Sequence, residues 1–154
     1  MNGRVLSLQL LTAHGTRPRP VPEVRALVGR GLDGDIHGKT KPDSRRQVLI
    51  VDRATLLAMG LGPGDLREQI TVEFPSLETL PVGTLLRTGE VTFELTGVCE
   101  PCTHIGALNG VSDAEAFRSA LGGRRGQLAR VTTVEGEGHI RVGDVIAVVT
   151  GSPR

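Results

Sequence analysis

A hairpin pattern between residues 81 and 95 restricts the fold more than any other feature of the chain. Pro81–Leu86 reads as the start of a strand, Thr88–Glu90 as a turn around a glycine, and Val91–Leu95 as a returning strand with alternating apolar residues. Arg141–Ile146 has the same short pattern as Pro81–Leu86, a Val-Gly pair followed by a small polar residue and aliphatic residues. This repeated pattern is typical of strands that enter a small β-barrel, and closure of a barrel would remove exposed strand edges.

The composition supports a β-rich interior. Hydrophobic residues make up 38% of the 154 residues, but the chain has only three Phe and no Trp or Tyr, so its core must be aliphatic. Branched aliphatic residues favour strands. A chain of this length can bury about two thirds of its unfolded surface without disulfides. We therefore expect one mainly β domain over residues 1–154, a closed or nearly closed β-barrel with a few short helices.

The remaining elements are expected from apolar alternation and from helix signals. Further strands are expected at residues 4–11, 23–28, 47–52, 67–72, 128–134 and 139–149. The 47–52 strand is almost continuously apolar, which predicts burial on both faces. Helices are expected at residues 53–59 and 112–121, the second beginning with a capping box of Ser112 and Glu115.

A long polar loop follows the second expected strand. Gly29–Gly34 fits the letters of a dinucleotide-binding GxGxxG motif, but turn formers and a proline follow it. No helix is therefore predicted whose amino terminus could hold a pyrophosphate, and we reject that function. What remains is a glycine-rich loop that contains His37 and ends near Arg46, and a loop of this length is either mobile or functional.

The charge balance excludes some partners. Eighteen basic residues stand against 17 acidic ones, for a net charge of +1. This leaves no overall field for nucleic acid or an anionic membrane. The apolar stretch at the amino terminus is too short for a secretion signal, and no later stretch is long enough to span a membrane. We expect a cytoplasmic protein that binds neither nucleic acid nor membrane.

Both cysteines of the chain lie directly after the returning strand of the hairpin. Pro101 precedes Cys102 and lacks an amide donor, so strand pairing should stop there and leave the thiol in an accessible loop. In a reducing compartment, the CxxC spacing of Cys99 and Cys102 indicates catalysis, redox chemistry or metal binding rather than a structural disulfide.

Three chemistries remain open for the two thiols. A thioredoxin-like redox pair would need a helix after it, and the glycine-interrupted segment 103–110 predicts a poor helix. A zinc site could use Cys99, Cys102 and His104, with His37 as a fourth ligand. Alternatively, Cys102 could carry sulfur as a persulfide or bind a transition metal, with His104 or a nearby arginine lowering its pKa. The simplest alternative is that both cysteines are small buried hydrophobic residues.

Arginines near glycines are the candidate anion ligands. Arg124 and Arg125 follow two glycines and precede a third, and Arg46 ends the polar loop. Guanidinium groups hold phosphate through bidentate hydrogen bonds, and glycine-rich turns expose backbone amides to an anion. These three residues are predicted to bind a cofactor phosphate.

Several short motifs, taken in order, resemble the MOSC domain family, which is named after the carboxyl-terminal domain of molybdenum cofactor sulfurases. The motifs are Gly31–His37, Arg46–Ile50, Pro63–Glu68, Leu80–Gly83, Thr96–Cys102, Gly126–Arg130 and Ile140–Asp144. The resemblance implies a barrel like that of the small domain of pyruvate kinase. It also implies that Cys102, in the Pro-Cys position, is the key cysteine, which accepts sulfur or coordinates the molybdenum of a bound pterin cofactor.

The chain departs from the amidoxime-reducing members of that family at one position. Those relatives carry an arginine three residues before the key cysteine, where this chain has Cys99. A second thiol beside Cys102 would suit sulfur relay, because it can release a persulfide by forming a disulfide. No desulfurase segment and no lysine in a pyridoxal phosphate setting are recognisable, so sulfur is expected from a partner such as a cysteine desulfurase or from a small thiol.

The sequence therefore predicts a sulfur carrier or a molybdenum cofactor-binding protein. Cys102 would be the acceptor or metal ligand and Cys99 the resolving thiol, while His37 and His104 would donate protons or orient the reacting groups. The alternative is a non-catalytic zinc-binding or interaction module. A nucleic-acid-binding barrel is disfavoured by the near-neutral charge and the scarcity of aromatic residues.

Overall fold

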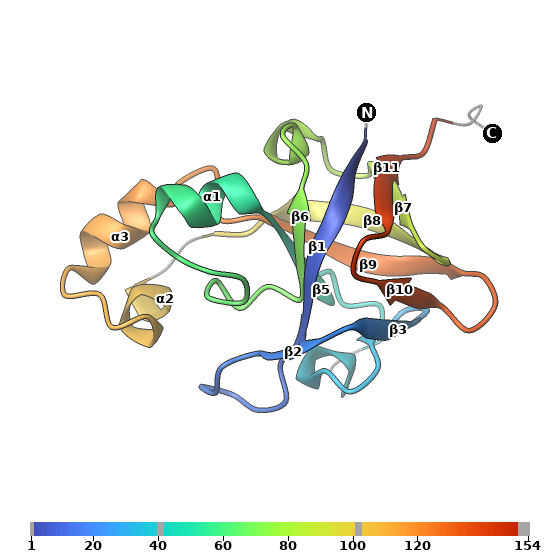
Figure 1. Ribbon diagram of the computed structural model, residues 1–154, viewed down its shortest axis with the longest axis horizontal. Coiled ribbons are helices and arrows are strands. Elements are labelled where there is room, and N and C mark those ends of the chain that lie inside the picture. Colours follow the sequence, from blue (N-terminus) through green and yellow to red (C-terminus); the bar gives the residue numbers. More distant parts are fainter. Residues whose placement is uncertain (1, 40–41, 101–102, 151–154) are drawn as a thin grey trace.

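The described residues form a β-barrel with three short α-helices gathered on one side, as the computed structural model shows (Figure 1). The structure describes residues 2–39, 42–100 and 103–150. Around the barrel the strands follow the order β1, β11, β7, β8, β9, β5 and β6, and β6 pairs with β1 again. Their bounds are β1 Asn2–Leu10, β5 Val48–Asp52, β6 Ile70–Glu73, β7 Leu85–Thr88, β8 Val91–Val98, β9 Gln127–Val134 and β11 Val145–Val148.

Pairing between the first and last barrel strands closes the sheet. Asn2 lies opposite Ala147 and Arg4 opposite Val145 in an antiparallel register. Closure leaves these strands without free edges, and it confirms the predicted closed barrel. β2 (Arg19–Val21) extends the sheet from the end of β1, while β10 (His139–Arg141), β3 (Glu23–Leu27) and β4 (Gly31–Leu32) form a small separate sheet.

The predicted hairpin is present, with a shorter first strand. β7 and β8 pair from Leu85 opposite Glu94 to Thr88 opposite Val91, and the turn contains Gly89 at a φ of 54°. A Cβ atom on Gly89 would lie 2.5 Å from the carbonyl oxygen of His139, so only glycine fits this turn. The residues before Leu85 form a turn closed by the amide of Thr84 and the carbonyl of Pro81, 3.2 Å apart.

Two hydrophobic clusters meet at β5, whose five residues are all buried. Val48 and Ile50 pack inside the barrel, in a cluster that includes Phe74 and Phe93. Leu49 and Val51 belong to a second cluster outside it, with Leu56, Leu66, Cys99, Ile105, Phe117 and Leu121. The continuous apolar run predicted that β5 is buried on both faces, and the structure confirms it. Packing of the second cluster against the outer face of β5 joins the helices to the barrel.

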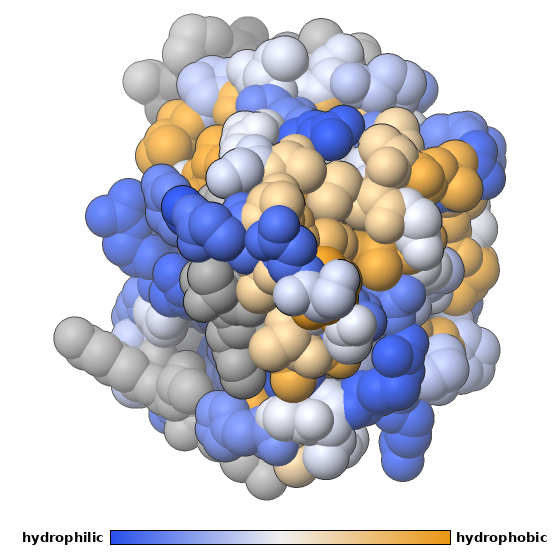
Figure 2. Space-filling view, turned by 90° about the vertical axis from the view of Figure 1, so that its left-hand side faces the viewer, coloured by the Kyte–Doolittle hydropathy of each residue, from blue (hydrophilic) through white to orange (hydrophobic). Residues whose placement is uncertain are grey.

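The helices cover the second cluster. The helices are α1 (Arg53–Ala58), α2 (Thr103–Leu108) and α3 (Ala114–Ala120), with 3₁₀ turns η1 (Ile36–Lys39) and η2 (Leu77–Thr79). Two predictions about the helices, a poor helix at residues 103–110 and a capping box of Ser112 and Glu115, are wrong. Figure 2 views this side and shows apolar side chains among charged ones; Leu57 of α1 is 68% exposed. No helix in the described part of the chain is long and apolar enough to cross a membrane.

Segment 103–110, predicted to be a poor helix, contains α2. Ile105 is buried in the second cluster and Leu108 packs against it, so tertiary burial outweighs the low helix propensity of glycine. A Cβ atom on Gly106 would lie 3.1 Å from the Cα of Ala114, so glycine also permits the close approach of α2 and α3. One objection to a redox pair, the lack of a following helix, is thereby removed.

The capping box predicted for the next helix is absent. Asp113 is the N-cap of α3, and its carboxylate accepts a hydrogen bond from the amide of Ala116 at 3.0 Å. Glu115 instead forms an ion pair with Arg118 one turn later. Asp and Ser are about equally good N-cap residues, so the sequence pattern could not distinguish Asp113 from its neighbour Ser112, which it selected wrongly.

The barrel interior should depend strongly on Phe93, whose side chain is fully buried. Replacing Phe93 with Ala leaves a cavity among aliphatic side chains and should lower the free energy of unfolding by about 3–5 kcal/mol. Urea unfolding followed by circular dichroism measures the change. Val82→Ala is the control, because Val82 is 64% exposed and should change stability by less than about 0.5 kcal/mol. Similar small losses in both variants would contradict the described core.

Candidate functional site

A pocket of about 170 Å³ lies where several barrel strands end near the helices. It is built from segments far apart in the sequence: the ends of β1 and β8, the η1 loop, β5, the segment before β6 and the turn before β9. Its lining residues are Leu11, His37, Arg46, Leu49, Arg67, Gln69, Cys99, Arg125 and Leu128. Four of the seven residues singled out in the sequence for a site, His37, Arg46, Cys99 and Arg125, therefore lie around one cavity.

Cys99 forms part of the pocket wall directly after β8. It is 5% exposed, and its amide donates to the carbonyl of Gly126 at 2.8 Å, which ties the end of β8 to the turn before β9. Its thiol also belongs to the second hydrophobic cluster. Cys102 and the side chain of His104 lie outside the described residues, although the backbone of His104 is part of α2.

His37 is held in place by the buried carboxylate of Asp35. Nδ1 of His37 lies 3.0 Å from Oδ1 of Asp35 and 3.2 Å from the side-chain nitrogen of Gln69. Asp35 is 1% exposed and also accepts hydrogen bonds from the amides of Leu11 and His37. The carboxylate thus fixes the orientation of the ring at the pocket wall.

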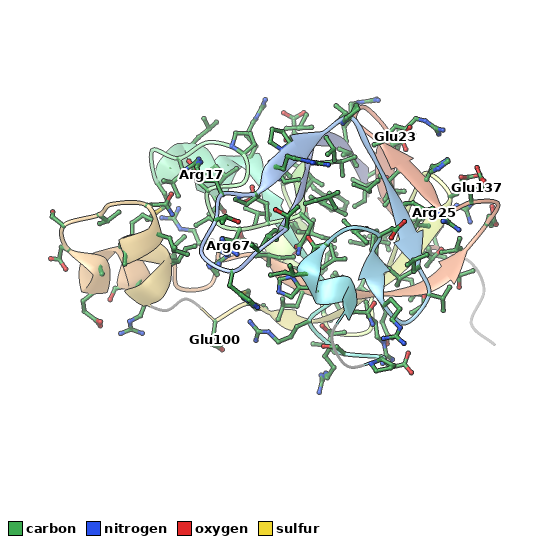
Figure 3. The ribbon with its side chains drawn as sticks, turned by 90° about the horizontal axis from the view of Figure 1, so that it is seen from below. Arg17, Glu23, Arg25, Arg67, Glu100 and Glu137 are labelled. Carbon is green, nitrogen blue, oxygen red and sulfur yellow. The ribbon has the colours of Figure 1, made fainter. Side chains whose placement is uncertain are left out.

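Three arginines line the same pocket. Arg46 is exposed just before β5, whereas Arg125 is only 8% exposed in the glycine-rich turn before β9. Arg67 has a φ of 60°, and its Nη1 donates to the carbonyl of Thr16 at 2.6 Å. Partial burial lowers the pKa of Arg67, while the charge of Asp35 acts in the opposite direction. Figure 3 shows Arg67 in the region between the barrel and the helices.

The charges of the lining residues have one sign. Arg46, Arg67 and Arg125 are cations, and no carboxylate is among the described residues that line the pocket. Asp35 contacts the ring of His37 and is itself fully buried, so its charge is engaged inside the protein. Guanidinium groups that converge on a partly enclosed space bind oxyanions through charge-assisted hydrogen bonds.

Arg124 does not line the pocket. Its Nε donates to the carbonyl of Ala120 at 3.2 Å, and its Nη2 lies 3.8 Å from the sulfur of Met59. The side chain therefore serves the carboxyl end of α3, where a cation also interacts favourably with the helix dipole. Of the two adjacent arginines, Arg125 is the pocket residue.

Comparison with known proteins identifies the family. The model of the MOSC domain matches residues 33–147 of the chain. The chain belongs to the MOSC domain family. This confirms the resemblance drawn from the short motifs. No curated protein sequence matches the chain.

Solved structures show the same fold. The chain is similar to the YuaD protein from Bacillus subtilis, with a TM-score of 0.80 and 21% identity over 95% of this chain and 94% of that one. It is also similar to YiiM from Escherichia coli, with a TM-score of 0.71 and 17% identity over 100% and 72% of the two chains. YiiM from Geobacillus stearothermophilus gives a TM-score of 0.73 and 16% identity over 96% and 75%. At these identities the likeness shows a shared barrel.

Sequence reasoning assigned no role in the MOSC pocket to Arg67, Asp35 or Gln69. Asp35 stands two residues before His37, a spacing that lets a carboxylate reach both the amide and the ring of the histidine. That local signal was available in the sequence. Gln69 reaches the site only because the segment before β6 lies beside β5, where its side-chain oxygen accepts the amide of Leu49 at 2.8 Å. No local pattern predicts such a contact.

A buried carboxylate shapes the segment that carries Arg67 and Gln69. Glu68 is fully buried and accepts hydrogen bonds from the amides of Gly64 at 3.0 Å and Leu66 at 3.1 Å, and from the hydroxyl of Thr71 at 2.8 Å. Burial raises the pKa of Glu68, and these hydrogen bonds oppose the rise. The folded turn holds Arg67 in the left-handed backbone region.

The zinc alternative has little support within the described part of the chain. No group of three or more His, Cys, Asp or Glu residues that could hold a metal ion is found there. The predicted set of Cys99, Cys102 and His104 includes two residues whose side chains lie outside that part. That set therefore stays a prediction.

Glu68 should make stability depend on pH with a defined sign. Because its pKa is higher in the folded protein, the stability that it contributes is fully present below its unfolded pKa of about 4.3 and is lost as pH rises through the folded pKa. The difference in free energy of unfolding between the wild type and Glu68→Gln should therefore fall as pH rises from about 4. Urea unfolding in a series of buffers measures it. A difference that stays constant or grows with pH would contradict the raised pKa.

Proposed function

We propose that this MOSC domain handles sulfur through its two cysteines. Cys102 accepts a sulfur atom as a persulfide, and Cys99 is the second thiol that helps release it. The observation that supports this proposal is the pocket itself, which brings Cys99 together with His37 and three arginines from distant segments.

The arginines suit the anionic forms of sulfur. A thiolate is the nucleophile in sulfur transfer, and guanidinium groups hold anions through charge-assisted hydrogen bonds. Arg125 is largely buried, so its charge is weakly screened by water. Arg46 and Arg67, which are less buried than Arg125, add two further positive charges to the lining. An anionic persulfide formed beside this pocket would be stabilised in the same way.

His37 is the proposed proton carrier. Asp35 orients its ring, and a histidine with a partner carboxylate can take a proton from a thiol and return it to a leaving group. His104 remains a proposed second proton carrier, because only its position in the sequence supports it. Asp35 acts through His37 and is a positioning residue.

A molybdenum cofactor is the second group to consider, because the MOSC family is associated with it in general. The three pocket arginines would suit its phosphate. The pocket, however, has a volume of about 170 Å³, whereas sites that enclose drug-sized ligands span about 300–1,000 Å³. It can enclose one anionic end of a pterin cofactor but not the whole molecule. The described residues thus fit sulfur transfer better than a resident pterin, and sulfur would come from a donor such as a cysteine desulfurase.

Persulfide mapping tests the proposal. The protein is incubated with a cysteine desulfurase and free cysteine, and bound sulfur is located by mass spectrometry. The wild type should gain one sulfur at Cys102, and Cys102→Ser should gain none there. Cys99→Ser should still accept sulfur but pass it more slowly to a small thiol acceptor, because the resolving thiol is missing.

Metal and pterin analysis of the same preparation completes the test. If Cys102 gains no sulfur, the proposal is wrong. Stoichiometric zinc that is lost in both Cys99→Ser and Cys102→Ser, together with loss of fold, would instead establish the zinc-binding module.

A further inference from the structure

We infer that the pocket takes sulfur directly from a small sulfur oxyanion with a transferable outer sulfur, of which thiosulfate is the simplest. The inference rests on the proposed sulfur-handling function and adds the chemical class of the donor. It comes from three properties of one cavity: the sign of its charges, its size, and the position of its thiol.

The charges favour a doubly charged anion. Arg46, Arg67 and Arg125 line the cavity, and the described lining residues include no carboxylate to repel a ligand. A dianion can accept charge-assisted hydrogen bonds from more than one guanidinium at a time, each stronger than a bond between neutral groups. A neutral donor such as free cysteine, whose amino group is also a cation, would gain less from this wall.

The size favours a small ligand. A volume of about 170 Å³ is well below the range for drug-sized molecules, but it is ample for a tetrahedral oxyanion. Phosphate and sulfate share this size and charge. The pocket chemistry therefore selects tetrahedral oxyanions in general, and the position of the thiol selects among them.

The apolar wall of the pocket is continuous with the thiol. Leu49 and Cys99 belong to one hydrophobic cluster, and Leu128 packs against that cluster. Thiosulfate has three oxygens at one end and a soft, weakly hydrated sulfur at the other. Its oxygens can accept hydrogen bonds from the arginines, and its weakly hydrated outer sulfur can contact the apolar wall that contains Cys99. Sulfate and phosphate would place an oxygen against this wall and lose hydration there without a partner.

The transfer step balances without an external oxidant. The thiolate of Cys99, which lines the cavity, attacks the outer sulfur of thiosulfate, and a new S–S bond forms. The S–S bond of thiosulfate breaks, and its electron pair leaves with the sulfite dianion. Attack by the Cys102 thiolate on that outer sulfur then moves it to Cys102 and returns Cys99 to a thiolate. The products are a protein persulfide and one sulfite. His37 accepts the proton when the attacking cysteine begins as a thiol.

Sulfite release and ligand binding test the inference in the whole chain of residues 1–154. We expect one sulfite per protein on addition of thiosulfate, with a matching persulfide on the cysteine pair, and no sulfite from the Cys99→Ser, Cys102→Ser double variant. That double variant should still bind thiosulfate in calorimetry, because the arginines remain.

Matched arginine variants locate the binding site. Arg46→Gln and Arg67→Gln should each weaken thiosulfate binding by about tenfold or more, because each removes a charged hydrogen-bond donor. Arg45→Gln is the control: Arg45 is exposed, neighbours Arg46 in sequence, and donates to the carbonyl of Thr96 instead of lining the pocket. Unchanged circular dichroism and melting temperature establish that each variant is folded. Equal binding by all three variants would overturn the assignment of the pocket.

Loading by a desulfurase separates this inference from the function on which it rests. If the desulfurase and cysteine load sulfur on Cys102 but thiosulfate releases no sulfite, the donor inference is wrong and the sulfur-handling function stands. If neither donor loads sulfur, both are wrong. If inorganic phosphate binds as tightly as thiosulfate, and thiosulfate releases no sulfite, the pocket is a phosphate site and the inference is also overturned.

Discussion

The burial of β5 on both faces is the constraint on which the structure depends. One face completes the barrel interior, and the other carries Leu49 and Val51 into the cluster beneath the helices. Because the strand belongs to both clusters, the helices cannot shift relative to the barrel without exposing apolar surface at about 25 cal/mol per Å². The pocket lies along this junction, and Leu49 is one of its walls. The same packing that stabilises the fold therefore holds the site.

Two buried carboxylates prepare the pocket without lining it. Asp35 accepts hydrogen bonds from the backbone amides of Leu11 and His37 and orients the His37 ring, while Glu68 folds the turn that presents Arg67. A buried carboxylate is costly unless it is hydrogen-bonded, and both have several donors. The acidic groups are thus used inside the protein, and the basic ones face the cavity. This division gives the pocket its positive sign in a chain whose net charge is only +1.

Much of the fold could be predicted from short-range patterns. Alternation identified the β7–β8 hairpin, the continuous apolar run identified the doubly buried β5, and the repeated Val-Gly pattern pointed to a barrel. Helix α2 could not be predicted, since Gly106 weakens the local signal and the burial of Ile105 that compensates for it depends on tertiary contacts. Some residues of the site could likewise be predicted: the chemistry of their side chains identified Cys99, His37 and Arg125 as candidates. That Arg125 and not Arg124 lines the pocket, and that Gln69 and Arg67 take part, could not be predicted because these features depend on packing between distant segments.

A crystal structure of the Cys99→Ser, Cys102→Ser double variant with bound thiosulfate is the sharpest test of the pocket as a sulfur-donor site, because this variant can bind the donor without consuming it. We expect density for one anion whose oxygens lie about 2.7–2.9 Å from guanidinium nitrogens of Arg46, Arg67 or Arg125, with the anomalous signal of the outer sulfur beside residue 99. Thiosulfate bound elsewhere, or a pocket that stays free of it at saturating concentration, would contradict the proposed donor site.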